Sequence, residues 1–358
     1  MDNLIPQVPF VQMPDFMLLL VLAAAIWILM RGADTLVEGA AGLAYKMGIP
    51  KVIVGATIVS LGTTMPEATV SVMAAWEGKA DLALGNAVGS IIADTGLIFG
   101  LGCVLTVLPA DRFVLTRQGW LKIATGTLLA ALCYGAWIIS GPAAQLDTGV
   151  GLLLLLCLAA YLYVSVKWSR QHPQGEQFVV VEADGKVDQD AVSAVIADGD
   201  LGERSTWVLS IMIPIGLAVV VFSSRFVIAS VTELAERWHV PNDVVAVTLV
   251  AFGTSLPELV VGMTAIYKGH KELLVGNVIG ADILNVLFVI GASAVAAPLL
   301  IVPNFLYLHL PAMMVMMMLF LAYILFAVRS GHFRRWFGVP LLGLYGAYVV
   351  ICLVVAKN

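Results

Sequence analysis

The sequence predicts an all-α integral membrane protein with ten transmembrane helices, arranged as two inverted-topology repeats of five. Three observations predict this fold. Of the 358 residues, 60% are hydrophobic and only 12% are charged, whereas a soluble domain has about 25% charged residues. Apolar runs of about twenty residues, the length of helix that crosses roughly 30 Å of hydrocarbon, recur along the chain. Two long motifs also repeat at a constant spacing of 191 residues.

Ten apolar spans follow one another, and we expect each to be a membrane helix. They cover residues 16–46, 50–77, 80–108, 118–140, 147–167, 206–238, 242–267, 272–297, 305–328 and 336–356. The one long connection is rich in Asp, Glu and Gly, which is typical of a solvated linker, although its FVVVEAD segment could form a strand of a small regulatory unit. The predicted organisation is a first repeat at 1–168, an acidic cytoplasmic linker at 169–205 and a second repeat at 206–358.

Basic residues predict the orientation of the spans. Loops and helix ends after odd-numbered spans hold fourteen Lys and Arg residues, and the other side holds three. The fourteen are Lys46, Lys51, Arg112, Arg117, Lys122, Lys167, Arg170, Lys186, Arg204, Lys268, Lys271, Arg329, Arg334 and Arg335, against Lys79, Arg237 and Lys357. By the positive-inside rule, the odd loops are cytoplasmic and both termini are extracytoplasmic. We expect a multi-pass protein of the cell (inner) membrane.

Other chemistry has little support in the sequence. The N-terminal segment has two acids and no basic residue before the first apolar run, so we expect no cleaved signal. The four cysteines lie in apolar runs without a C-x-x-C motif, which argues against a zinc site or a disulfide framework. The net charge of −5 comes largely from the acidic linker, and nothing indicates nucleic acid as a partner. We expect no cofactor.

The repeated motifs are the strongest signal. TIVSLGTTMPEATV at 57–70 matches TLVAFGTSLPELVV at 248–261, and LALGNAVGSIIAD at 82–94 matches LLVGNVIGADILN at 273–285. Since each half has an odd number of spans, the second copy enters the membrane from the opposite face. In transporters built this way, the substrate lies near the midplane, at helices interrupted by Gly and Pro at matching positions.

Each GTxxPE motif offers oxygen ligands. Pro66 and Pro257 lack an N–H, which frees the carbonyls of Gly62 and Gly253. Hydroxyls and a carboxylate follow in each copy: Thr63, Thr64 and Glu67 in the first, and Thr254, Ser255 and Glu258 in the second. Hard cations such as calcium and sodium prefer such an all-oxygen set. Taken singly, a membrane Glu could pair with an Arg and a Pro–Gly bend could be only a kink, but the symmetric pair favours an ion site.

The second motif of each half adds a helix face. Spacing of four residues places Asn86, Ser90 and Asp94 on one face, and Asn277, Ala281 and Asn285 on the equivalent face. The two Asn residues at the start of these faces could be ligands or could bond neighbouring helices. Ionised Glu67, Asp94 and Glu258 would give three negative charges, which match one divalent cation with a proton or three monovalent cations. The sequence therefore indicates exchange chemistry.

In combination, GTTMPE, GTSLPE and the following GNxxG helices resemble the two α-repeats of the sodium/calcium exchanger family, in the calcium/cation antiporter superfamily. The resemblance covers nearly the whole chain and implies Ca²⁺ export in exchange for Na⁺ by alternating access, with the first and sixth helices sliding across the rest. It also implies that Glu67 and Glu258 are the central calcium ligands. By position, the calcium and sodium sites would be completed by Thr63, Thr64, Thr254, Ser255, Ser90, Asp94 and Asn285. We expect a monomer in the lipid bilayer, with Ca²⁺ and Na⁺ as its partners.

The chain departs from the family pattern in one region. Where the family usually has GSN, the first half has GSI with Ile91 and the second half has GAD with Ala281 and Asp282. The second half therefore loses a hydroxyl and gains an acid. We include this acid, Asp282, in the ligand set. Prokaryotic members end the first motif with Asn and the second with Asp, whereas here the order is Asp94 and Asn285. A proton/calcium exchanger using the same acidic site is the alternative if GAD cannot hold sodium, although that branch usually has GNxPE-like motifs.

An enzyme is the third hypothesis, with Glu67 and Glu258 as an intramembrane acid–base pair. Neither a nucleophile nor a metal-binding His accompanies these two residues in their motifs. An enzyme also gives no reason for a repeat at constant spacing. We therefore expect a transporter and no enzymatic activity.

Overall fold

The computed structural model describes residues 13–47, 49, 51–171, 204–237 and 253–356. Most of the predicted linker and the first part of the predicted seventh span fall outside these residues. Within them the chain is almost entirely helical.

The first half of the chain contains a long N-terminal helix, a helix with several breaks, and three further long helices. Its elements are α2 (Asp15–Met47), α3 (Lys51–Val54), the π-helix η1 (Gly55–Val59), α4 (Ser60–Thr63), α5 (Met65–Trp76), α6 (Ala80–Ala93), the π-helix η2 (Asp94–Phe99), α7 (Gly100–Leu105), β1 (Leu108–Pro109), α8 (Arg112–Val114), the π-helix η3 (Leu115–Gly119), α9 (Trp120–Ser140), η4 (Gly141–Ala143), β2 (Gln145–Leu146) and α10 (Thr148–Gln171).

The second half repeats the order of the long helices in its described residues. It contains α12 (Thr206–Arg237), α14 (Leu256–Tyr267), α15 (Lys271–Leu284), the π-helix η5 (Asn285–Ile290), α16 (Gly291–Ala296), β3 (Leu299–Leu300), the π-helix η6 (Phe305–His309), α17 (Leu310–Ser330), β4 (His332–Phe333), η7 (Arg335–Phe337) and α18 (Gly338–Ala356).

Eight helices in the described residues are long and apolar enough to cross a membrane, and two shorter apolar helices cover Lys51–Thr63 and Leu256–Tyr267. The multi-helical membrane fold predicted from the sequence is therefore confirmed. The predicted span at 50–77 is divided at Thr64, where α4 ends and α5 begins. The count of ten spans stays a prediction.

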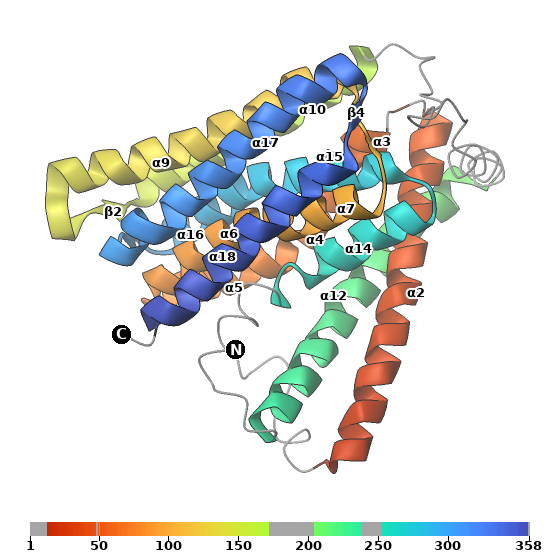
Figure 1. The fold of residues 1–358 in the computed structure, drawn as a ribbon, viewed down its shortest axis with the longest axis horizontal. Helices are drawn as coiled ribbons and strands as arrows, with labels where there is room; N and C mark the ends of the chain where they lie inside the picture. The colour runs from red at the N-terminus through yellow and green to blue at the C-terminus, as the bar shows by residue number, and fades with distance from the viewer. Residues whose placement is uncertain (1–12, 48, 50, 172–203, 238–252, 357–358) are drawn as a thin grey trace.

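Helices α2 and α12 lie side by side at one end of the molecule, inclined to the long helices α9, α10, α17 and α18 (Figure 1). Glycines allow their close approach, because a Cβ on Gly32 or Gly216 would lie within 3.0 Å of backbone atoms of the other helix. Their buried side chains belong to a hydrophobic cluster that is distinct from the main core and that also includes residues of α3, η1, α14 and α15. The two helices therefore pack as a unit.

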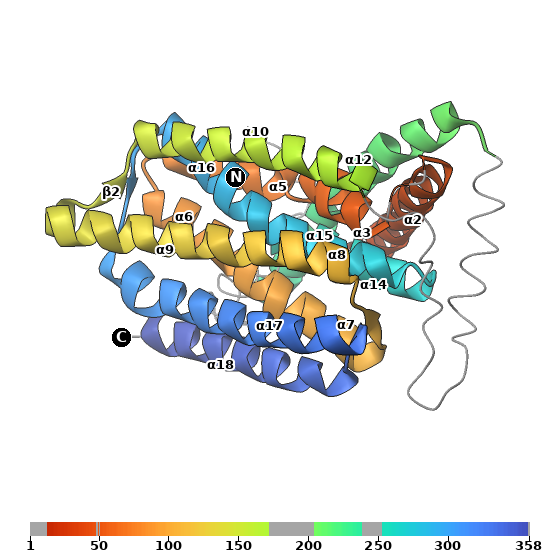
Figure 2. The same cartoon turned by 90° about the horizontal axis from the view of Figure 1, so that it is seen from above.

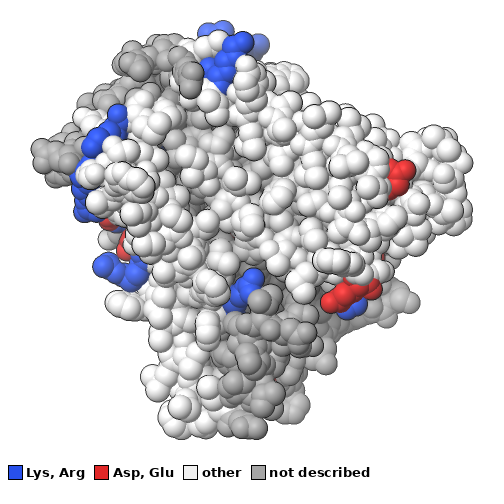
Figure 3. Space-filling view, turned by 180° about the vertical axis from the view of Figure 1, so that it is seen from behind, with Lys and Arg blue, Asp and Glu red and all other residues white. Residues whose placement is uncertain are grey.

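The main core surrounds two continuous helices, α6–η2–α7 and α15–η5–α16. The second is the most enclosed, with 94% of its most apolar window buried. Seen from above, α9, α10, α17 and α18 run along the outside of this core (Figure 2). Phe99 packs edge-on against Phe320 and Phe333, with ring centroids 4.9 and 5.0 Å away. Charged side chains on the face seen in Figure 3 lie mainly near its margins, as expected for a surface facing lipid.

Short strands connect the two halves in a reciprocal way. β1 pairs antiparallel with β4, and β2 pairs antiparallel with β3. Each two-stranded sheet therefore takes one strand from each half. β3 begins 191 residues after β1, the spacing of the repeated motifs.

Helix α15 packs directly on the backbone of the continuous helix α3–η1–α4. A Cβ on Gly276 would collide with Val52, and a Cβ on Gly280 would collide with Ala56 and Ser60. These two positions therefore require glycine, and they bring the second half of the chain against the first GTxxPE motif.

Candidate ion-binding site

Both GTxxPE motifs lie where a helix begins with proline in its first turn. Thr64 precedes α5 with φ −77° and ψ −6°, and Ser255 precedes α14 with φ −85° and ψ 7°. Pro66 and Pro257 follow within the first two helical residues, so Glu67 and Glu258 both stand in a first turn. Since proline has no N–H, the backbone bonds of the preceding turn are incomplete and its carbonyls are available to a ligand.

Four carboxylates lie in the interior of the bundle. Glu67 and Asp94 are each 1% exposed, Glu258 is 2% exposed and Asp282 is completely buried. Asp94 interacts electrostatically with both Glu67 and Glu258, and the two glutamates also interact with each other. The structure thus brings together the three carboxylates that the sequence singled out.

Hydroxyls of one half lie beside the acids and amides of the other. Thr254 lies beside Glu67 and donates to Asn86 Oδ1 at 3.1 Å. Thr63 lies beside Glu258 and donates to Asn277 Oδ1 at 3.4 Å. Ser90 Oγ is 3.4 Å from the hydroxyl of Thr254. The candidate site is therefore formed by both halves.

The side chain of Asn86 supports helix α5. Its amide nitrogen donates to Ser71 Oγ at 2.9 Å and to the carbonyl of Glu67 at 3.3 Å. These bonds tie α6 to α5 at the residue that carries the carboxylate. Asn86 thereby fixes the position of Glu67, whatever else its Oδ1 binds.

Many oxygens of this region are buried without a hydrogen-bond partner among the described residues. They are Thr64 Oγ1, both carboxylate oxygens of Glu67 and of Asp94, Ser255 Oγ, Glu258 Oε2, Asp282 Oδ1 and Asn285 Oδ1. Buried polar atoms are normally hydrogen-bonded, so these unsatisfied oxygens are candidates to bind a ligand. Hard cations fit an all-oxygen set.

The acids alone do not form a complete metal centre. Across the residues that the structure describes, no three His, Cys, Asp or Glu side chains are arranged so that they could hold a metal ion by themselves. Hydroxyl, amide or carbonyl oxygens would therefore have to complete the shell of a bound cation. The backbone carbonyls of Gly62 and Gly253, both buried, stand in the turns where such oxygens are expected.

Lys122 is a residue of this region that the sequence analysis assigned elsewhere. It was counted among basic residues at cytoplasmic helix ends, but its side chain is completely buried. Its Nζ is 2.7 Å from Asp282 Oδ2 and donates to Thr95 Oγ1 at 2.8 Å. The count of basic residues on the predicted cytoplasmic side is thus thirteen. Asp282 could have indicated this role from the sequence, because a buried acid is strongly destabilising unless a cation pairs with it.

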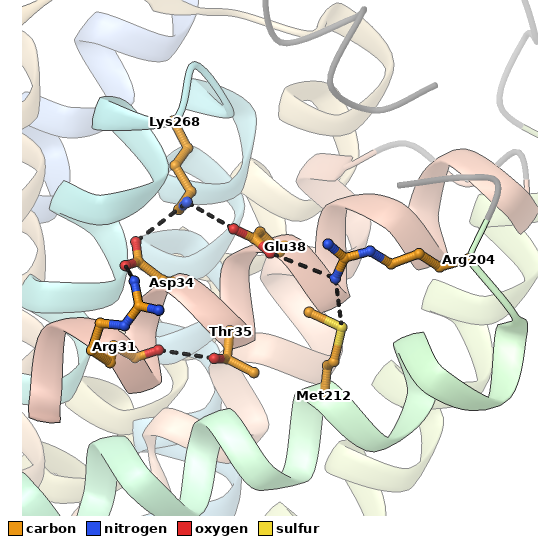
Figure 4. A network of polar contacts seen from close by, with 7 residues as sticks. All are labelled: Arg31, Asp34, Thr35, Glu38, Arg204, Met212 and Lys268. Carbon is orange, nitrogen blue, oxygen red and sulfur yellow. Dashed lines mark hydrogen bonds and ion pairs between the residues drawn. The ribbon is translucent and has the colours of Figure 1, made fainter. Parts of the chain in front are cut away.

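A second polar network joins α2 to the turn between α14 and α15 (Figure 4). Lys268 Nζ lies 2.9 Å from Glu38 Oε1 and 3.4 Å from Asp34 Oδ1. Arg204 also approaches Glu38, at 3.8 Å. This network ties the α2–α12 unit to the rest of the bundle.

Comparison with known proteins identifies the family of this chain. The family model described as sodium/calcium exchanger protein matches residues 17–167 and 208–354. The inner membrane protein YrbG of Escherichia coli is 30% identical over 277 residues, which cover 77% of this chain and 79% of YrbG. The sodium/calcium exchanger MaX1 of Methanosarcina acetivorans is 26% identical over 349 residues, covering 93% of this chain and 97% of that protein.

Among solved structures, the sodium-calcium exchanger NCX_Mj soaked with 10 mM Na⁺ and 10 mM Sr²⁺ has the same fold. The TM-score is 0.74 at 22% identity, over 94% of this chain and 99% of that one. Since the family model covers both helical halves, the chain belongs to the sodium/calcium exchanger family of membrane antiporters.

Proposed function

We propose that this protein is a sodium/calcium antiporter that exports Ca²⁺ in exchange for Na⁺ by alternating access. The observation that carries the proposal is the pair Glu67 and Glu258, both buried, each in the first turn of a proline-started helix and each beside a hydroxyl of the opposite half. Calcium and sodium would compete for this site because both prefer oxygen ligands.

Ten transmembrane helices in two inverted repeats are part of this proposal, with repeats at 1–168 and 206–358 and the acidic linker at 169–205. The matching positions of η2 and η5, which begin at Asp94 and Asn285, support it. The reciprocal strand pairs β1–β4 and β2–β3 also support it. A two-fold axis that relates β1 to β3 and β2 to β4 would turn the β1–β4 pair into the β2–β3 pair.

The proposed ligands divide into carboxylates that hold calcium and neutral oxygens that complete the calcium and sodium shells. Glu67 and Glu258 are central, with Asp94 as the third charge. The neutral oxygens come from Gly62, Thr63, Thr64, Ser90, Gly253, Thr254, Ser255 and Asn285. The all-oxygen chemistry of these groups, many of them buried without a partner, supports the assignment.

Alternating access would arise from movement of the α2–α12 unit across the remaining helices. A Cβ on Gly62 would lie only 2.5 Å from a methyl group of Leu217, so α12 touches the first GTxxPE turn directly. Movement of α12 would therefore uncover or cover that turn. The close packing of α2 on α12, where a Cβ on Gly216 would lie within 3.0 Å of the backbone of Leu36, supports their motion as one body.

A proton/calcium exchanger is the second candidate, and one observation favours it. Ala281 is completely buried in α15 at the position equivalent to Ser90, where it offers no side-chain oxygen. A sodium ion would lose a ligand there, whereas a proton needs only a carboxylate. Both candidates use the same acids.

Gradient-driven uptake distinguishes the two. Purified protein is reconstituted into liposomes loaded with Na⁺ or adjusted to an acidic interior, and ⁴⁵Ca²⁺ uptake is measured from a choline medium at matched osmolarity. Uptake driven by the sodium gradient supports the first candidate, and uptake driven only by the proton gradient supports the second. No uptake under either gradient would refute the antiporter proposal. Liposomes with the E67Q/E258Q protein serve as the control.

The remaining expectations concern placement in the cell. We propose a monomer of the inner membrane with both termini extracytoplasmic, surrounded by lipid and without a cofactor. Accessibility of a single cysteine introduced at either terminus to an impermeant thiol reagent tests the orientation in intact spheroplasts. Labelling only after permeabilisation would contradict it.

A further inference from the structure

The completely buried ion pair of Lys122 and Asp282 has no assigned role in the exchange described above. The ammonium of Lys122 has three contacts: Asp282 Oδ2 at 2.7 Å, Thr95 Oγ1 at 2.8 Å and the face of the Phe320 ring at 3.7 Å. Thr95 in turn donates to Asp282 Oδ2 at 2.8 Å. The group is therefore held from α9, η2 and α15 at once.

This ion pair adjoins the candidate ion site. Thr95 directly follows Asp94 in η2, and Asp94 interacts electrostatically with both Asp282 and Lys122. A positive charge held at this place acts on the same carboxylate that would bind a transported cation. We propose that the Lys122 ammonium is a tethered cation that occupies the cation position formed by Asp282 and Thr95, so that Asp282 recruits no mobile ion.

Charge balance supports this role. Ionised Glu67, Asp94, Glu258 and Asp282 would put four negative charges in the bundle, and Lys122 offsets one of them. The remaining three negative charges equal the charge predicted for the site from Glu67, Asp94 and Glu258 alone. Asp282, which the sequence analysis placed among the ligands, would then be the partner of Lys122 instead.

The other half of the chain shows that packing alone does not require an ion pair here. At the repeat spacing of 191 residues, Lys122 corresponds to Met313 and Asp282 to Ile91, both completely buried. The burial pattern follows the same spacing, because Gly126 and Leu129 correspond to the buried Met317 and Phe320. An apolar pair therefore fills the equivalent place in the second half, and the ionic pair needs another explanation.

The inference rests on the proposed function, since it assigns Lys122 to the same cation site, but its test needs no transport. Purified protein is titrated with ⁴⁵Ca²⁺ at constant ionic strength. Na⁺ then replaces choline in steps, and the Hill coefficient with which Na⁺ displaces the bound calcium is measured. Thermal unfolding over a Na⁺ series counts the bound Na⁺ independently, because ligand binding stabilises the folded state by mass action.

Four variants and one control make the test specific. K122M exposes Asp282 to mobile cations, and we expect the sodium Hill coefficient to rise by about one as charge balance is restored. D282N leaves the ammonium uncompensated beside Asp94, and we expect calcium affinity to fall about tenfold or more. K122M/D282I, which copies the pair of the other half, should return both values to wild type. K122R keeps the charge and should keep the Hill coefficient.

The control is K79M, because Lys79 also forms a 2.7 Å ion pair, with Glu77, but at the surface. It should change neither value. An unchanged Hill coefficient in folded K122M, or a calcium affinity in D282N equal to that of wild type, would overturn the proposal. If K122M alone does not fold, the loss in D282N and its recovery in K122M/D282I decide the matter. If wild-type protein shows no gradient-driven uptake, the antiporter proposal is refuted. The measured numbers of bound Na⁺ and the calcium affinities would still test the role of Lys122.

Discussion

The charge of Glu67 provides the most direct test of the candidate site. In E67Q the side chain keeps its size and one carbonyl oxygen and loses only the negative charge. Two unit charges about 4 Å apart interact by roughly 4 kcal/mol at an effective dielectric constant near 20, and a divalent ion doubles this to about 8. Desolvation offsets part of that attraction, so the net loss should be nearer the ~3–5 kcal/mol measured when one partner of a buried ion pair is removed.

A loss of this size lowers calcium affinity by about two to four orders of magnitude. Binding of ⁴⁵Ca²⁺ to purified, monodisperse protein measures it, and uptake into sodium-loaded liposomes should fall to background. E258Q should behave in the same way, because Glu258 occupies the equivalent place in α14. D94N should also weaken calcium binding. E77Q is the control, since Glu77 is exposed and pairs with Lys79. An E67Q protein that binds calcium within threefold of wild type would refute the site assignment.

Three further predictions concern the surrounding structure. Burial, together with Lys51 and Lys268 nearby, lowers the pKa of His270 to about 3, and its Nδ1 lies 3.0 Å from Lys51 Nζ. The unfolded chain therefore binds the proton more readily, so the free energy of unfolding is highest above about pH 6.5 and is about 2 kcal/mol lower at pH 5. H270N should flatten the pH dependence of the unfolding midpoint in this range. An equal slope in both proteins would contradict the assignment. K268A removes the contacts with Asp34 and Glu38 and should change the rate of calcium uptake without changing equilibrium calcium binding, because neither contact lies at the ion site. G280V forces a side chain into the backbone of η1 and should destabilise the protein by at least ~1–3 kcal/mol, whereas G135A, where the new Cβ meets no described atom within 4 Å, should not destabilise it.

The breaks at the two GTxxPE motifs were predictable because they follow from covalent chemistry. A proline has no N–H wherever it stands, so Pro66 and Pro257 each leave one backbone hydrogen bond of a helix unmade in any environment. The carboxylates of Glu67 and Glu258 were predictable for a similar reason, since an acid in an apolar span is costly unless it has a function. These are properties of single residues, and their occurrence in both copies of the repeat strengthened the prediction.

Lys122 was misplaced because its role depends on contacts distant in the chain. Near Arg117, at the start of an apolar run, it has the sequence context of a residue at the membrane surface, and the positive-inside rule counts residues by position alone. Its acidic partner, Asp282, lies 160 residues later. Only the packing of α9 on α15 determines that the side chain points inward. The π-helical turns η2 and η5 were also absent from the sequence prediction, because a shift in backbone bonding depends on the surrounding packing.

The two halves differ most where Asp94 meets α15. A symmetric site would have one acid or amide from each repeat at equivalent places, as Asp94 and Asn285 do in the order of the sequence. The structure adds Asp282 and Lys122 next to Asp94 and nothing charged at the equivalent Ile91 and Met313. The charged side chains next to Asp94 therefore have no charged counterpart at the equivalent residues of the other half. An ion bound by Asp94 would lie close to the positive charge of Lys122, whereas an ion bound near Asn285 would have a neutral ligand. We therefore expect the choice of coupling ion to depend on this asymmetry more than on the two repeated GTxxPE turns.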